Sequence, residues 1–156
     1  MALRIKVNET RSWAPPKDAL GCDLVIHAGL AGNRQEDLWM IRDIVEFGAR
    51  QGADVQLLAP LHALAAAGLP RGQALCVVTL DGWTATEAAA RIVSPLEYAL
   101  GNYGHGRAAW HTSNLRVLKT FMPMRGHQGL RRVPPGLEAL IRAEMPLTQQ
   151  SFGALE

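Results

Sequence analysis

The chain is poor in cysteine. Its two cysteines, Cys22 and Cys76, both lie inside apolar runs and show no paired metal-type spacing. This excludes a disulfide-dense secreted domain and a cysteine-based zinc site. Both thiols are predicted to behave as small buried side chains.

Long hydrophobic stretches are also missing. The longest apolar run, from Leu57 to Leu69, is interrupted by Pro60 and His62 and is too short to span a bilayer. The N-terminus alternates apolar and basic residues, so it lacks the apolar centre of a signal peptide. The sequence therefore predicts a cytoplasmic protein that does not enter a membrane.

Established nucleotide, metal and catalytic motifs do not occur in the sequence. It contains no GxGxxG fingerprint, no GxxxxGK[ST] loop, no HExxH pair and no GxSxG elbow. His105, His111 and His127 match no known ligand spacing, so no metal site is predicted. The sequence identifies no cofactor and does not decide whether the protein is an enzyme.

What is present is the composition of a folded domain. The 156 residues are 48% hydrophobic and 19% charged, which are globular values. They predict a single domain over 1–156, with an N-terminal strand and loop over 1–20 and a loose tail over 146–156. Residues 1–100 carry 9 Lys/Arg against 11 Asp/Glu (net −2), and residues 101–156 carry 7 against 3 (net +4). The basic C-terminal third is either a site for phosphates or an acidic partner, or simply a solvated surface.

Apolar patterning predicts strands and helices in alternation. Strand-like runs occur at residues 3–7, 22–27, 55–58, 74–80 and 115–121, and helical spacing with start signals occurs at 34–51, 60–67, 84–93, 95–100 and from 135 onward. The clearest start is Asn33, with Glu36 three residues on as in a capping box. Alternation from residue 22 to about 121 is typical of βαβ units. The predicted fold is a single three-layer α/β domain with a mostly parallel sheet and helices on both faces.

Two polar residues follow predicted strands. His27 comes after residues 23–26, and Asp81 comes after residues 76–80. In a parallel sheet, ligands bind at the carboxyl ends of strands, so an imidazole and a carboxylate there would form an acid–base pair. His27 and Asp81 are therefore the candidate catalytic residues. The alternative is that Asp81 starts an Asp-Gly turn and His27 makes a local hydrogen bond.

The turn after the second predicted strand is a candidate anion site. Gly29, Gly32, Asn33 and Arg34 lie between a strand and a helix N-terminus, where free N–H groups and the helix dipole attract negative charge. A small anionic or nucleotide-like ligand would fit there. The alternative is an ordinary turn built of small residues.

The segment 101–111 is rich in glycine, aromatic and basic residues. Its candidate ligand-binding side chains are Tyr103, His105, Arg107, Trp110 and His111. These could stack on a flat ring or contact a phosphate backbone. A basic track could extend the surface downstream through Arg116, Lys119, Arg125, His127, Arg131 and Arg132. The alternative is a mobile connection with one tryptophan in the core.

Three classes of function follow from these features. The favoured class is a small-ligand-binding protein or modest enzyme with a site at the strand ends. A nucleic-acid-associated protein using residues 101–132 is the first alternative. A non-catalytic assembly component, joining copies of itself or another protein, is the second. In that class, Trp13, Trp39 and Trp83 are either core or interface aromatics.

Overall fold

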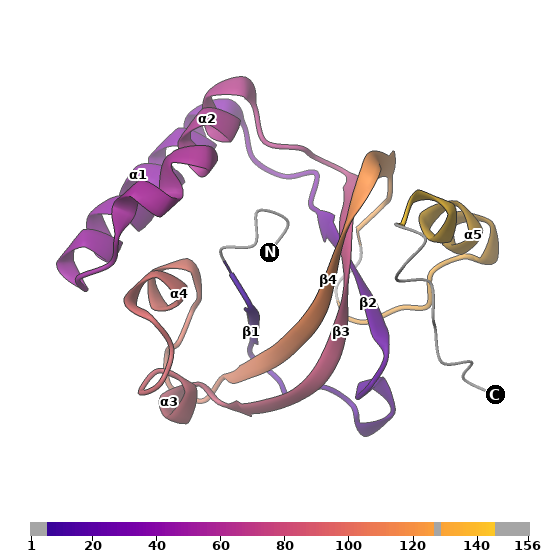
Figure 1. The fold of residues 1–156 in the computed structure, drawn as a ribbon, viewed down its shortest axis with the longest axis horizontal. Helices are drawn as coiled ribbons and strands as arrows, with labels where there is room; N and C mark the ends of the chain where they lie inside the picture. The colour runs from indigo at the N-terminus through magenta and orange to yellow at the C-terminus, as the bar shows by residue number, and fades with distance from the viewer. Residues whose placement is uncertain (1–5, 127–128, 146–156) are drawn as a thin grey trace.

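The computed structural model describes residues 6–126 and 129–145, which form a curled sheet with helices on its two sides (Figure 1). The four strands lie in the order β1-β4-β3-β2, and all three pairings are antiparallel. The strands are β1 Asn8–Arg11, β2 Asp23–Ala28, β3 Gln73–Ala85 and β4 Ala108–Pro123. The helices are α1 Arg34–Arg50, α2 Ala59–Ala67, α3 Thr86–Ala89, α4 Pro95–Leu100 and α5 Pro135–Glu144, with 3₁₀ turns η1 Lys17–Ala19 and η2 Val55–Leu58.

The predicted mostly parallel, three-layer sheet is wrong. Residues 55–58, predicted as a strand, form η2, and the Asp54 carboxylate accepts a hydrogen bond from the Gln56 N–H at 3.0 Å. Helices α1 and α2 therefore follow one another with no strand between them, and β2 and β3 pair as antiparallel neighbours. A four-residue segment such as Val-Gln-Leu-Leu is too short to show a periodicity that separates a strand from a helical turn.

Strands β3 and β4 are much longer than the sequence predicts. β3 continues through Asp81 and Gly82 to Ala85, where the sequence predicts a turn and a helix start. β4 begins at Ala108, inside the predicted loop over 101–111. Together they form one long antiparallel pair, and the segment that connects the two strands contains α3 and α4.

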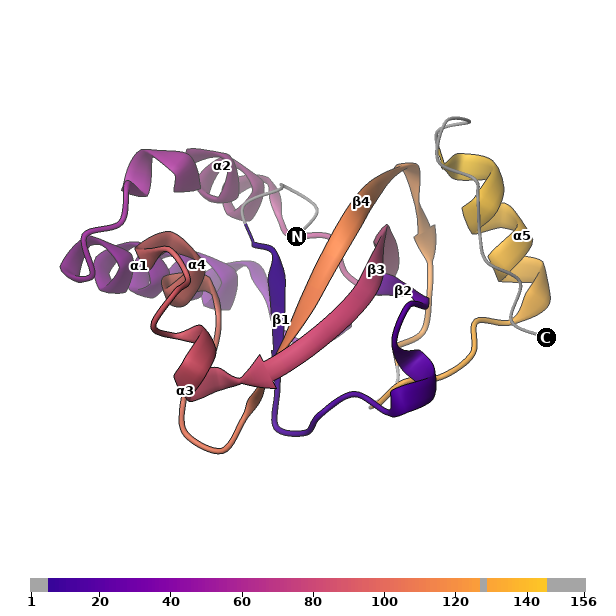
Figure 2. The ribbon, with the colours of Figure 1, turned by 60° about the horizontal axis from the view of Figure 1, so that its bottom comes forward.

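The β3–β4 pair is strongly bent. Its register shifts at three places between Ala74 and Gly82. On the opposing strand, Asn114 adopts a positive φ of 49°. Bulges of this kind bend a strand and increase its twist. As a result the sheet curls into a half-barrel (Figure 2).

Several local helix predictions are confirmed. The Asn33 side chain accepts hydrogen bonds from the N–H groups of Gln35 and Glu36, and the Glu36 carboxylate accepts one from the Asn33 N–H at 3.1 Å. The hydroxyl of Ser94 accepts a hydrogen bond from the Glu97 N–H at 3.1 Å, and Pro95 occupies the first turn of α4. These caps depend on short sequence spacings, so they are visible without the fold.

Two predictions concern the ends of the chain. The expected strand over 3–7 lies mostly outside the described residues, and the strand observed nearby is β1, from Asn8 to Arg11. The predicted loose tail, 146–156, lies wholly outside them.

Helices lie on opposite sides of the sheet (Figure 1). On one side, Ile141 and Met145 in the α5 region pack against Ala74, Val77 and Leu118 of the long strands. On the other side, α1 packs mainly against α2, η2 and α4. Of the helices in the described ranges, none combines the length and apolar character needed to cross a membrane.

A buried ion pair cross-links three strands. The fully buried Arg116 side chain on β4 forms a bidentate pair with Asp23 on β2, with Nη1 donating to Oδ2 at 2.9 Å. Between them on β3, the Thr79 hydroxyl donates to Asp23 Oδ1 at 2.8 Å. Arg116 Nε also donates to the carbonyl of Asn114 at 3.0 Å, next to the bulge. The guanidinium therefore fixes both the strand pairing and the bend.

Removing the carboxylate should be strongly destabilising. In Asp23→Ala the Arg116 charge stays buried without its main partner, a situation that typically costs about 3 to 5 kcal/mol. Urea unfolding should show this loss. The matched control is Asp43→Ala, which breaks an exposed pair with Arg42 at 3.0 Å and should cost less than about 1 kcal/mol. Equal effects of the two substitutions would contradict the role given to Arg116.

Candidate functional site

The predicted pair of His27 and Asp81 is not brought together by the sheet. His27 lies opposite Ala74 at one end of β2, whereas Asp81 lies seven residues further along β3, beyond the other end of β2. At ~3.3 Å per residue, that separation is on the order of 20 Å along the strand. Asp81 accepts a hydrogen bond from the Ser113 hydroxyl at 2.9 Å. A catalytic role for either residue alone stays a prediction.

The polar groups at the N-terminus of α1 already have partners within the chain. Glu36 and the buried Asp37 place carboxylates in the first turn of α1. Arg71 donates to the Ala31 carbonyl at 2.5 Å and to Asp37 at 2.6 Å, which ties the turn to the helix. These carboxylates occupy the position that an anion would take at the helix N-terminus. Anion binding at Gly29, Gly32, Asn33 and Arg34 stays a prediction.

The aromatic rings of the 101–111 segment lie in the core. Tyr103 and Trp110 are buried, and Trp110 Nε1 donates to the Trp13 carbonyl at 3.0 Å. Tyr103 packs against Tyr98, Ala89 and Ala109. Trp110 packs against Leu80 and the Trp13 ring, so neither ring offers an open stacking face. The predicted basic track also loses Arg116, which is buried against Asp23.

The remaining polar side chains of the segment have local partners. Arg107 donates to the carbonyls of Asn102 and Thr10. His111 Nδ1 lies 2.9 Å from the side-chain oxygen of Asn8. His105 is exposed, and its Nδ1 lies 2.5 Å from the Glu87 carboxylate. The pKa of Glu87 is lowered, chiefly because its carboxylate accepts the Gly106 N–H. Of the predicted downstream track, His127 lies outside the described residues.

A hollow lies elsewhere, between α1 and α4. It is a shallow, open groove of about 550 Å³. The residues that line it are mostly apolar, with two carboxylates among them: Glu36, Trp39, Met40, Asp43, Ile44, Phe47, Ala99 and Gly101. We call this the α1–α4 groove.

Helix α1 forms the groove because it carries apolar residues on more than one face. Leu38, Ile41, Val45 and Ala49 form an inner apolar stripe at helical spacing, and Ile41 in it is buried. Met40, Ile44 and Phe47 follow a second line at helical spacing, toward α4. Trp39 stands beside that line and remains 53% exposed. Sequence reasoning missed this face, although the Trp39-Met40 pair beside the inner stripe widens the apolar arc beyond what one core face needs.

The wall formed by α4 is held close to α1 by small and aromatic contacts. A Cβ at Gly48 would lie 3.4 Å from the Ala99 side chain, so the two helices approach closely there. The Phe47 and Tyr98 rings stack at 5.9 Å, and Tyr98 stacks in turn on Tyr103 at 5.4 Å. This run of rings connects α1 through α4 to the sheet.

A buried carboxylate fixes α4 on the edge strand. Glu97 is only 4% exposed, yet it accepts hydrogen bonds from the N–H groups of Val7 and Asn8, both at 2.9 Å. The Tyr103 hydroxyl donates a third bond to it at 3.1 Å. Burial, and next the negative charge of Glu97, raise the pKa of Tyr103 well above its usual value. The groove wall is thus anchored through a single carboxylate.

Known proteins give no independent guide to this site. No protein-family model matches the chain, and no curated protein is significantly similar to it. Among the residues that the structure describes, no three His, Cys, Asp or Glu side chains gather as a possible metal site.

The raised pKa of Tyr103 predicts a loss of stability in alkali. Above pH ~10 the tyrosine ionises in the unfolded chain but stays protonated in the folded one, so the unfolded state binds fewer protons and is favoured as pH rises. Between pH 9 and 11 the wild type should lose about 1 kcal/mol more unfolding free energy than Tyr103→Phe. Urea unfolding across this range measures the difference. Parallel pH curves for the two proteins would contradict the buried Tyr103–Glu97 contact.

Proposed function

We propose that this chain is a non-catalytic assembly component whose α1–α4 groove binds a helical protein segment. The observation that carries the proposal is the exposure of Trp39 (53%) and Met40 (47%) on the lip of an open apolar groove. Exposed apolar side chains clustered at a hollow mark interaction sites, and tryptophan is enriched among the residues that dominate binding energy. A groove between two helices suits the apolar face of a third.

The rim of the groove defines the chemistry of the partner. Glu36 and Asp43 are among its lining residues. The sequence from Glu36 to Glu46 contains four acidic residues, of which Asp37 is buried against Arg71 at 2.6 Å, and one arginine. That arginine, Arg42, is paired with Asp43 at 3.0 Å. A segment with basic residues beside its apolar face would therefore be steered to the groove and oriented there.

The other classes of function receive less support from the geometry. A site for a small molecule normally encloses most of the ligand surface, and the α1–α4 groove is shallow and open. The nucleic-acid class relies on Tyr103 and Trp110 as stacking faces, and both rings are buried. These classes stay predictions, whereas docking uses the side chains that the fold leaves exposed.

A synthetic peptide tests the groove directly. We expect an amphipathic helical peptide of leucine, alanine and lysine to shift the ¹⁹F resonance of Trp39 in 5-fluorotryptophan-labelled protein, because the indole becomes covered. The Trp83 resonance is the matched control, since Trp83 is 45% exposed on β3, away from the lining residues. Single Trp→Phe variants assign the signals.

A second peptide distinguishes binding that depends on the acidic rim from non-specific apolar binding. The same helix with glutamate in place of lysine should bind at least tenfold more weakly, because its charge repels the rim. A Trp39 resonance that stays unshifted with the lysine peptide would contradict the docking function. Equal shifts at Trp39 and Trp83 would do the same.

A further inference from the structure

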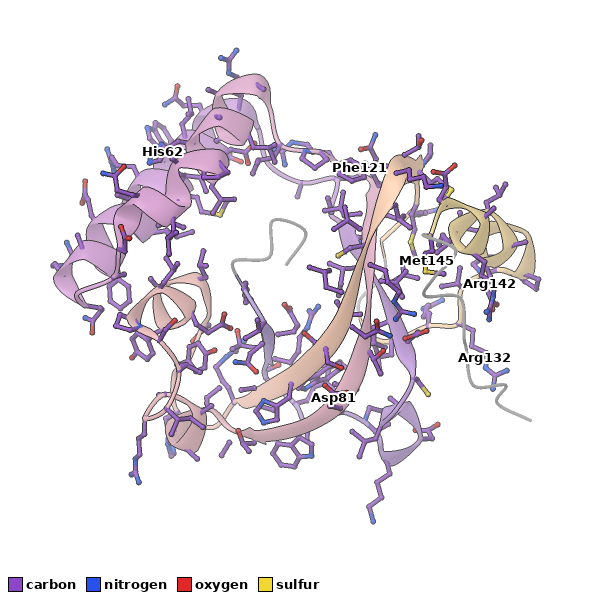
Figure 3. The ribbon with its side chains drawn as sticks, viewed as in Figure 1. His62, Asp81, Phe121, Arg132, Arg142 and Met145 are labelled. Carbon is purple, nitrogen blue, oxygen red and sulfur yellow. The ribbon has the colours of Figure 1, made fainter. Side chains whose placement is uncertain are left out.

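The chain itself carries a second exposed apolar surface, on α5. Leu140 is 59% exposed, and the small residues Gly136, Ala139 and Ala143 are exposed near it at helical spacing. Ile141, on the opposite face, is buried against the sheet. Figure 3 shows Met145 on the side of α5 near the sheet and Arg142 on the outer side. The outer face of α5 therefore presents one large apolar side chain among small ones.

The sequence before α5 is basic. No aspartate or glutamate occurs between Tyr98 and Leu137. Arg125, Arg131 and Arg132 are exposed in the approach to α5, and Figure 3 shows Arg132 below the helix, further from it than Arg142. Within α5, Arg142 is paired with Glu138 at 2.5 Å. An apolar helix face next to exposed arginines is the chemistry that the α1–α4 groove is proposed to bind.

The two surfaces lie at opposite ends of the molecule. Figure 1 shows α1 and α2 on one side of the curled sheet and α5 on the other. Packing of Ile141 and Met145 against Ala74, Val77 and Leu118 holds α5 on its own side. Helix α5 therefore cannot fill the groove of its own chain while it keeps this packing.

We infer that the occupant of the α1–α4 groove is the outer face of α5 from a second copy of this chain. This inference rests on the proposed function of the groove. Leu140 enters the apolar hollow beside Trp39 and Met40, and the arginines before α5 face the carboxylates of Glu36 and Asp43. Because two different surfaces meet, a pair of copies keeps one free groove and one free α5, so the contact extends head to tail into rings or filaments.

The strength of this contact follows from its size. A single helix in a shallow groove is smaller than a standard stable interface, which buries roughly 1,600 Å² in total. Association should therefore be concentration-dependent in the micromolar range, and it should weaken as salt screens the arginine–carboxylate pairs.

Sedimentation equilibrium of the full chain tests the inference. The wild type should form species larger than a dimer as concentration rises, whereas Trp39→Asp, Met40→Glu and Leu140→Asp should each weaken association at least tenfold. All three side chains are exposed, so the variants should keep the wild-type thermal unfolding. Trp83→Asp and Ile92→Asp change exposed apolar residues away from both surfaces and should associate like the wild type.

Mixing the variants tests the head-to-tail geometry. Trp39→Asp keeps an intact α5 face, and Leu140→Asp keeps an intact groove. An equimolar mixture should form a heterodimer of twice the 16.9 kDa chain mass and nothing larger, because one functional contact is all that each pair can make. Failure of the mixture to form this heterodimer would overturn the head-to-tail contact.

The outcomes separate this inference from the function on which it rests. A wild type that stays monomeric while the lysine peptide still shifts Trp39 would overturn self-association and leave the docking function standing. Association lost in Trp39→Asp but kept in Leu140→Asp would exclude α5 as the occupant. A monomeric wild type whose Trp39 resonance also stays unshifted with the lysine peptide would overturn both self-association and the docking function.

Discussion

The groove depends on the burial of one charge. Glu97 is withdrawn from water inside the fold, and its carboxylate is retained there because the N–H groups of Val7 and Asn8 and the Tyr103 hydroxyl all donate to it. A buried carboxylate with unsatisfied oxygens would be costly, so the edge strand, the 101–107 segment and α4 must keep this arrangement together. The position of α4, and with it one wall of the groove, follows from that constraint.

The curled sheet explains why the molecule has two separate exposed apolar surfaces. Bulges in the β3–β4 pair bend the sheet, and the Arg116–Asp23 pair holds three strands at the bend. Helix α5 covers one side of the sheet, whereas α1 packs mainly against α2 and α4 and not against the strands. Each helical layer therefore buries one apolar face and leaves another exposed. Assembly of copies would bury the exposed faces without requiring any change in the fold.

Local signals in the sequence predicted more than the global pattern did. The caps at Asn33 and Ser94 were readable because they depend on neighbours within a few residues. Strand direction was not readable, because it depends on which strands pair. The segment Val55–Leu58 was predicted as a strand and forms a 3₁₀ turn. Likewise Tyr103 looked accessible in a glycine-rich segment but is buried by packing against Tyr98, Ala89 and Ala109. The groove requires α4 to lie beside α1, so only the apolar Trp39 region hinted at it.

A concentration series of amide NMR spectra on the uniformly ¹⁵N-labelled full chain tests the central claim most directly. The account predicts that signals from α1, between Glu36 and Phe47, and from α5, between Gly136 and Ala143, shift together as concentration rises, with one common midpoint. Signals from β2 and from residues around Trp83 should stay unchanged. Shifts confined to one of the two helices, or spread evenly over the sheet, would contradict assembly of α5 into the groove.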